Sequence, residues 1–277
     1  MYSLKYKLKK NKMTYSIFIK TAKKANSKQN RVIGAYGRVY SPYGWSGSSK
    51  VMTDYKRLMP TQLTQTQINV TVGLLLGDAS MERYYTPSKK GTVSPVIRFG
   101  QEPQRQELVL YYHSLMASFI SAPPTLKLHK TRKKKDGSIS ETVVVSTLSS
   151  PVFSPFADLF YITYPEKKGK NWGRKIVSPG RASYLNAEVL AFWFAADGCL
   201  VTDKYGATAG YRLFTGDFTR DELALLQEMF YNKFGFIPTT QRSYEQLRLF
   251  VKKEHTELFR TIVEPYLPQC CHYKLYK

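Results

Sequence analysis

Two stretches of the chain are hydrophobic at almost every position, and each predicts a buried helix. The first covers residues 68–76 and follows residues 64–67 (TQTQ), a capping box in which Thr64 and Gln67 satisfy free N–H groups of the first turn. The second covers residues 187–197, after Asn186 as its N-cap. Because a helix that is apolar on all sides must be covered on most of them, both helices should lie inside the fold.

The rest of the hydrophobic pattern alternates between strand and helix periods. In the first half it predicts a strand, a helix, two strands and a short helix, over residues 92–100, 102–120, 126–130, 141–147 and 155–161. In the second half it predicts two strands, a helix, two strands and a helix, over residues 199–204, 208–215, 220–234, 236–242, 246–252 and 255–263.

The order helix, hairpin, helix, hairpin, helix thus occurs twice. An internal repeat of this kind predicts two similar half-domains in an α+β fold. We place the first repeat at residues 63–165, a polar and basic linker at 166–184, and the second repeat at 185–277.

The charge changes this picture, because 42 Lys and Arg against 20 Asp and Glu give a net charge of +22 over 277 residues. Such a charge opposes compaction by self-repulsion and therefore favours an anionic partner. Nucleic acid fits best, since neutralising phosphates releases condensed counterions. A membrane partner is not expected, because the sequence contains neither a basic amphipathic helix nor an apolar run of ~18 residues. Ribosomal and other RNA-scaffold proteins are also strongly basic, so the charge alone does not separate them from other nucleic-acid-binding proteins.

The positive charge begins in the N-terminal segment. Residues 1–53 contain twelve Lys or Arg and no Asp or Glu, and residues 34–47 are rich in Gly and Tyr without periodicity, which predicts a loop. We interpret residues 1–62 as a basic arm that contacts a phosphate backbone. An import sequence and an unstructured upstream reading frame are the alternatives.

Cysteine and histidine are too sparse for a disulfide framework or a zinc ribbon. The sequence has three cysteines and four histidines, and no CxxC pair. We expect a reducing compartment and no structural zinc.

Each apolar helix ends in a single acid, Asp78 in the first repeat and Asp197 in the second. If the two helices pack together, Gly73 and Gly77 allow close backbone approach and both carboxylates meet at the helix ends. Two carboxylates that close repel each other unless a divalent cation neutralises them. Paired acids with oxygen ligands suit Mg²⁺, and this composition is typical of a site for metal-assisted phosphodiester hydrolysis.

The helix segments VGLLLGDA (residues 72–79) and LAFWFAADG (residues 190–198) resemble the paired signature helices of the LAGLIDADG homing endonucleases. Residues 213–219 (LFTGDFT) and 266–275 (YLPQCCHYKL) extend the resemblance to single-chain members encoded in fungal and algal organellar introns. It covers about residues 63–277 and leaves the arm out. Two features depart from the family pattern: Phe192 replaces a small residue, and Gly216 stands where many relatives carry Gln.

The resemblance implies two pseudo-symmetric αββαββα half-domains that form a DNA-binding β-saddle. It implies a site-specific double-stranded DNA endonuclease that is a monomer with an internal pseudo-two-fold axis. It also implies an organellar location, for which a mitochondrion is preferred to a chloroplast. An RNA-binding maturase that assists splicing of its intron RNA, and a catalytically silent component of an organellar ribonucleoprotein, are the alternatives.

Residue by residue, the resemblance makes Asp78 and Asp197 the acids that bind Mg²⁺, with the backbone carbonyls of Gly77 and Ala196 as further metal ligands. It also implies a lysine near each metal site, which polarises the attacking water or stabilises transition-state charge. Lys274 matches this lysine in the second repeat, and Lys175, chosen over Arg174, matches it in the first.

Basic and polar residues on the predicted strands are candidates for DNA contacts, because alternate side chains on one face of a sheet can follow a groove. These candidates are Arg98, Lys127, His129, Arg132, Arg212, Arg242, Gln246 and Arg248. The basic segments 130–135 and 167–175 are expected to contact phosphates.

Overall fold

The chain separates into two compact units, Met1–Leu58 and Met59–Lys277. The computed structural model describes residues 32–33, 39–40, 56, 58–82, 94–121, 125–133, 139–163, 173–215, 218–243 and 246–276. In the first unit, strand β1 (Val32–Ile33) pairs antiparallel with strand β2 (Val39–Tyr40). The loop prediction for residues 34–47 is therefore wrong at β2, where Val39 and Tyr40 favour a strand despite the glycines around them.

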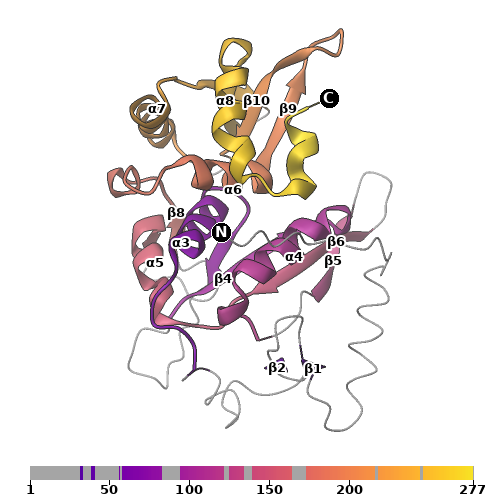
Figure 1. The fold of residues 1–277 in the computed structure, drawn as a ribbon, viewed down its shortest axis with the longest axis vertical. Coiled ribbons are helices and arrows are strands. Elements are labelled where there is room, and N and C mark those ends of the chain that lie inside the picture. The colour runs from indigo at the N-terminus through magenta and orange to yellow at the C-terminus, as the bar shows by residue number, and fades with distance from the viewer. Residues whose placement is uncertain are drawn as a thin grey trace, which may run out of the picture. The chain divides into compact units, whose positions relative to one another are not determined.

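The two apolar helices are α3 (Gln65–Leu76) and α6 (Ala187–Asp197), and they pack against each other at the centre of the second unit (Figure 1). The capping box of Thr64 and Gln67 is formed at the start of α3. The Asn186 side chain accepts a hydrogen bond of 2.9 Å from the Val189 N–H at the start of α6. The predicted helices and their N-caps are thus confirmed.

Glycines in α3 let the two helices approach closely. A Cβ atom at Gly73 would lie 2.6 Å from the Cβ of Phe192 and 2.7 Å from the Val189 carbonyl oxygen. A Cβ atom at Gly77 would lie 3.2 Å from the Cβ of Ala196. The predicted close approach is confirmed, because a side chain at position 73 would collide with α6.

A polar cluster connects the same helices near their N-terminal ends. The buried Asn69 donates to the Glu188 carboxylate at 2.6 Å, and its side-chain oxygen accepts from Gln65 at 3.0 Å and from Asn186 at 3.1 Å. Buried polar groups that need each other as partners favour one helix register over the others.

Both repeats have the order αββαββα, as predicted. The first repeat contains α3, β3 (Ser80–Glu82), β4 (Val96–Gln101), α4 (Gln106–Leu115), β5 (Thr125–Lys133), β6 (Ile139–Ser146) and α5 (Ser154–Phe160). The second contains α6, β9 (Gly198–Thr202), β10 (Thr208–Phe214), α7 (Arg220–Phe234), β11 (Thr239–Ser243), β12 (Gln246–Lys252) and α8 (Thr256–Val263).

Each repeat forms a four-stranded antiparallel sheet, with the order β3-β4-β6-β5 in the first and β9-β10-β12-β11 in the second. In both sheets the first strand of the repeat lies at an edge and the second pairs with the fourth. The identical strand order is the structural form of the internal repeat.

Several local predictions need correction. The helix expected over residues 102–120 is instead α4 between the short 3₁₀ helices Pro103–Arg105 and Ala117–Phe119, because Pro103 lacks an N–H and the chain tightens after Leu115. The repeat order implies a strand at the position of β3, but the hydrophobic pattern does not locate it, since three residues are too few to show an alternation. The expected linker contains strand β8 (Gly173–Lys175), which pairs with β7 (Tyr161–Thr163).

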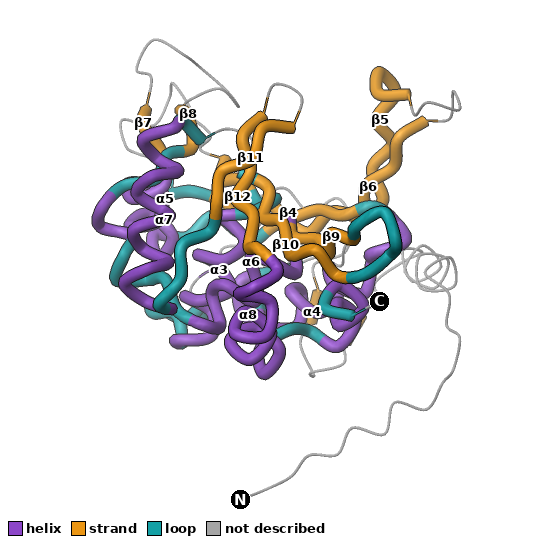
Figure 2. The backbone as a smooth tube through the Cα atoms, turned by 90° about the horizontal axis from the view of Figure 1, so that it is seen from above, coloured by secondary structure: helices purple, strands orange, loops and turns teal. Residues whose placement is uncertain are grey.

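The sheets place one face against the helices and leave the other open. In β4, Ile97 and Phe99 are buried and Arg98 is half-buried, as the alternation predicts. In the second sheet the residues that share the buried face are Tyr211, Leu213, Leu249 and Val251. Figure 2 shows the strands of both sheets on one side of the second unit and helices α3, α6 and α8 on the other. Among the described residues, no helix is long and apolar enough to cross a membrane.

Candidate functional site

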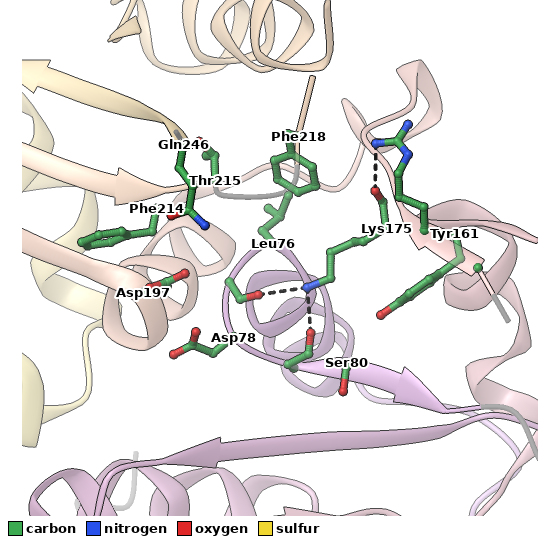
Figure 3. Close-up of a pocket in the computed structure, with 14 residues that line it drawn as sticks. Leu76, Asp78, Ser80, Tyr161, Lys175, Asp197, Phe214, Thr215, Phe218 and Gln246 are labelled. Carbon is green, nitrogen blue, oxygen red and sulfur yellow. Dashed lines mark hydrogen bonds between the residues drawn. The ribbon is translucent and has the colours of Figure 1, made fainter. Parts of the chain in front are cut away.

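A cavity of about 720 Å³ opens where α3 and α6 end (Figure 3). Residues from both repeats and from the linker strand β8 line it, so it exists only when the two halves are packed together. Its charged and polar lining includes Asp78, Asp197, Arg174, Lys175, Ser80, Thr215 and Gln246.

The two predicted acids meet at one side of this cavity (Figure 3). Asp197 is the last residue of α6, and Asp78 follows Gly77, the C-cap of α3. Protein atoms crowd both carboxyl groups, yet by accessible surface Asp78 is exposed and Asp197 is half-buried. Packing of the two helices therefore brings both acids to one place, as the pattern predicts.

Burial raises the pKa of both carboxyl groups. For Asp197 burial and then repulsion by the Asp78 carboxylate raise the pKa to about 7, against the attraction of Lys274 and Lys175. For Asp78 burial raises the pKa, while a hydrogen bond from Gln101 and the charges of the two lysines oppose the rise. The site thus holds two acids whose shared negative charge is costly without a cation.

Lys175 reaches into the cavity from β8, opposite the acids (Figure 3). Its Nζ donates to the Gly77 carbonyl oxygen at 3.0 Å and to the Ala79 carbonyl oxygen at 2.7 Å. These carbonyls flank Asp78, so the ammonium group lies at the end of α3, where the helix dipole is negative.

Lys274 has a different environment. It is 4% exposed, and its Nζ donates to the carbonyl oxygens of Ala195 at 2.6 Å and Phe194 at 3.3 Å, near the end of α6. Burial lowers its pKa. The two lysines therefore both bind helix-terminal carbonyls, but Lys175 lines the cavity whereas Lys274 is buried at the end of α6.

Gln101 is a site residue that sequence reasoning missed. It is the last residue of β4 and is 5% exposed, and its amide nitrogen donates to Asp78 Oδ2 at 2.5 Å and to the Ala196 carbonyl oxygen at 3.2 Å. One amide thus connects the first acid to the second signature helix. The available signal was a polar residue at a position that the strand alternation assigns to the buried face.

The donor set fits a divalent cation with hard oxygen ligands. Two carboxylates from different helices share one cavity, and the cost of their mutual repulsion is what a cation removes. The proposed carbonyl ligands are engaged by protein donors, Gly77 by Lys175 and Ala196 by Gln101. The described residues contain no cluster of three or more His, Cys, Asp or Glu, so water and phosphate oxygens would have to complete the shell.

On the second sheet, the structure brings three of the DNA-contact candidates together. Arg212 lies opposite Phe250, which shares a sheet face with Gln246 and Arg248 by strand alternation. Arg248 lies over the Phe214 ring at 4.2 Å, and Arg212 donates to the Gln241 side chain at 3.4 Å.

Arg242 is placed differently. It pairs with Leu247 and therefore lies on the other face of the sheet, where Leu249 and Val251 meet the helices.

On the first sheet, Arg98 forms an ion pair with Glu82 of the neighbouring strand and donates to Ser146 Oγ at 3.3 Å. Its charge is thus partly neutralised within the protein. Lys127, His129 and Arg132 lie on β5, where their side chains are outside the described residues. Gly216 is also outside them.

Comparison with known proteins adds relatives in sequence. The cytochrome b mRNA maturase bI2 of Saccharomyces cerevisiae is 28% identical over 211 residues, which are 75% of this chain and 47% of that protein. The chain therefore spans about half the length of this relative. The probable intron-encoded endonuclease 1 of Wickerhamomyces canadensis is 24% identical over 234 residues, which are 84% of this chain and 93% of that protein.

Comparison of structures supports the fold. The homing endonuclease I-WcaI, solved bound to its DNA recognition sequence, is similar with a TM-score of 0.70 and 22% sequence identity. The similarity covers 84% of this chain and 96% of that one.

The family model described as LAGLIDADG DNA endonuclease matches residues 68–259, a span that contains both signature segments (residues 72–79 and 190–198), with Asp78 and Asp197, and also Lys175. Since this is more than half of the chain, the protein belongs to the LAGLIDADG DNA endonuclease family.

Proposed function

We propose that this protein is a site-specific double-stranded DNA endonuclease, which hydrolyses one phosphodiester bond on each strand with divalent metal held by Asp78 and Asp197. The observation that carries this proposal is the convergence of one acid from each repeat in a single cavity, with Lys175 on its opposite wall. A site shared by two similar halves suits a substrate whose two strands are related by a similar pseudo-symmetry.

A bound Mg²⁺ ion would supply Lewis acidity toward a phosphate oxygen and lower the pKa of a coordinated water. The chain's own groups do the rest. Asp78 and Asp197 hold the cation, and the carbonyls of Gly77 and Ala196 are further candidates to bind it. Lys175 and Lys274 orient the attacking water or stabilise negative charge that develops on the phosphate, and Gln101 orients Asp78.

Contacts to DNA come, in this proposal, from the open faces of the two sheets. Arg212, Gln246 and Arg248 form the second-sheet part of the surface, beside the cavity that Gln246 also lines. Arg98, Lys127, His129 and Arg132 are the first-sheet candidates. Arg242 is the weakest candidate, because its strand register assigns it to the other face.

Both repeats occur in one chain, so we propose a monomer with an internal pseudo-two-fold axis. We further propose an organellar intron as its source, a mitochondrial one in the first place. The names of the relatives, a cytochrome b mRNA maturase and a probable intron-encoded endonuclease, support this.

A second candidate function is an RNA-binding maturase that assists splicing of its intron. The specific observation in its favour is the 28% identity to a protein named as a maturase. The same basic surface could hold intron RNA, and this role would not require the paired acids.

Cleavage of a supercoiled plasmid that carries the joined exons flanking the intron tests the first proposal. We expect a linear product with Mg²⁺ and none with EDTA. A plasmid that keeps the intron between the exons is the matched control and should stay intact. Splicing of the intron RNA, assayed with the same protein, tests the second candidate. Splicing without any cleavage of the joined-exon plasmid would replace the endonuclease by the maturase.

A further inference from the structure

Strand β8, which carries Lys175, is attached to the first repeat on one side. It pairs with β7, where Lys175 lies opposite Tyr161, and the Ile176 N–H donates to the Phe160 carbonyl oxygen at 2.9 Å. The Tyr161 hydroxyl in turn accepts a 2.9 Å hydrogen bond from the Met81 N–H, just beyond the end of α3. The backbone of Lys175 is therefore fixed to the half whose acid is Asp78.

Glu222 attaches the same segment to the second repeat. This residue lies in the first turn of α7 and is 8% exposed. Its Oε2 accepts from Arg174 Nη1 at 3.0 Å, and its Oε1 accepts from the Val177 N–H at 3.1 Å. The two partners flank Lys175 in the chain, on either side of the lysine that reaches into the cavity.

Helix capping alone does not account for these contacts. The capping box needs only the bond of 2.6 Å from the Thr219 N–H to Glu222 Oε2 and the bond of 3.3 Å from the Glu222 N–H to Thr219 Oγ1. The bonds to Arg174 and Val177 are additional and lead out of the helix into the linker. Although burial raises the pKa of Glu222, the bonds from Arg174, Thr219 and Val177 together bring it below its ordinary value.

We propose that Glu222 is a positioning residue, which holds the linker strand so that Lys175 reaches the end of α3. Through it the second repeat sets the position of a lysine that serves the acid of the first repeat. The expected effect on the cleavage rate rests on the proposed function. The expected effect on the position of Lys175 rests only on the hydrogen bonds of Glu222 to Arg174 and Val177.

Reductive methylation of the folded protein, followed residue by residue by mass spectrometry, tests the position of Lys175 without DNA or metal. In Glu222→Gln, which keeps the size but loses the charge, we expect the Lys175 amine to react roughly 10-fold faster, because its bonds to the Gly77 and Ala79 carbonyls open more often. Lys252, which is about half exposed, is the internal reference and should react equally in all variants.

Thr219→Ala is the matched control, because it removes the side-chain cap of the same helix and leaves Glu222 bonded to Arg174 and Val177. We expect it to lower the melting temperature while Lys175 keeps the reactivity of the unaltered protein. Glu222→Asp keeps the charge but has a side chain one methylene shorter. In this variant the reactivity of Lys175 should fall between that of the unaltered protein and that of Glu222→Gln. Glu222→Asp carries the test if Glu222→Gln does not fold.

The single-turnover cleavage rate gives the catalytic readout. Glu222→Gln should cleave roughly 10- to 100-fold more slowly, with DNA affinity unchanged within about twofold, because only the placement of the lysine is altered. Equal Lys175 labelling in Glu222→Gln and Thr219→Ala overturns the positioning role, whatever the cleavage rate. If labelling changes as expected but the unaltered protein cleaves no DNA, the proposed endonuclease function fails and the positioning role remains.

Discussion

The two acids of the site have unequal surroundings, although the repeats that carry them are alike. Asp78 accepts a hydrogen bond from Gln101, and the carbonyls on either side of it accept from Lys175. Asp197 lies beside a helix end whose carbonyls are bound by the buried Lys274, and its pKa is raised to about 7. The two halves of the site are therefore chemically different.

Replacing either aspartate by asparagine should abolish double-strand cleavage and leave DNA binding largely intact. The carboxylates anchor metal, whereas affinity comes mainly from phosphate and base contacts. Plasmid linearisation and a binding titration in Ca²⁺ would measure the two properties separately. Normal linearisation by Asp78→Asn or by Asp197→Asn would remove that residue from the site.

The two lysines should differ when each is replaced by methionine. Lys175→Met should slow cleavage with little change in melting temperature, because Lys175 lies on the cavity wall. Lys274→Met should also lower stability, by ~1–3 kcal/mol, because it removes the 2.6 Å hydrogen bond to the carbonyl oxygen of the buried Ala195. Thermal unfolding together with single-turnover cleavage checks both. A larger loss of stability in Lys175→Met than in Lys274→Met would contradict this assignment.

At the scale of elements, the contact between α3 and α6 decides where the site forms. The glycines of α3 let the helices come together, and the Asn69 cluster favours one register, so that both helices end at the same cavity. A sliding of one helix by a single turn would displace its acid by about 5.4 Å from the other.

Gly73→Ala should destabilise the unit formed by residues 59–277 by about 1–3 kcal/mol, since the new methyl group would meet the Cβ of Phe192 and the Val189 carbonyl. Denaturant unfolding measures the change. Gly180→Ala is the control, because its methyl group would meet only the end of the Leu159 side chain at 3.4 Å, an ordinary contact. Equal stability of Gly73→Ala and Gly180→Ala would mean that Gly73 does not lie in the contact between α3 and α6.

At the scale of the whole molecule, a large share of the positive charge lies in the N-terminal arm, outside the two repeats. Residues 1–53 contribute twelve of the 42 basic residues and none of the 20 acidic ones. Electrostatic attraction between these basic residues and phosphates adds affinity for any nucleic-acid backbone, but it does not distinguish one base sequence from another.

Deleting residues 1–53 should leave a protein that folds and cleaves, with weaker and less salt-dependent DNA binding. Each lost phosphate contact should flatten the slope of log K against log salt by about 0.9. Fluorescence anisotropy over a series of salt concentrations gives this slope, and a mismatched target serves as the control for sequence preference. An unchanged slope would assign the arm to targeting or to an upstream reading frame, and an insoluble product would mean that the arm packs on the fold.

The sequence by itself determined the repeated αββαββα order, the two buried helices with their N-caps, and the acid at the end of each. It could do so because these features are local: periodicity, capping boxes and the glycines of α3 depend on neighbours within a few turns. The matched position of Asp78 and Asp197 in two repeats was a strong signal for the same reason, since one copy supports the interpretation of the other.

Only the tertiary structure decided how the site is completed. Gln101 reaches Asp78 from a strand end, Arg242 falls on the opposite face from Arg212, and Glu222 holds β8 from a helix in the other half. Strands β7 and β8 pair with each other, although β8 lies in the segment that the sequence predicts as a linker. The sequence pattern does not show them, because each strand is too short to show a period. The hydrogen bonds of Gln101 to Asp78 and of Val177 to Glu222 join residues 23 and 45 positions apart, and no pattern within a short window records them.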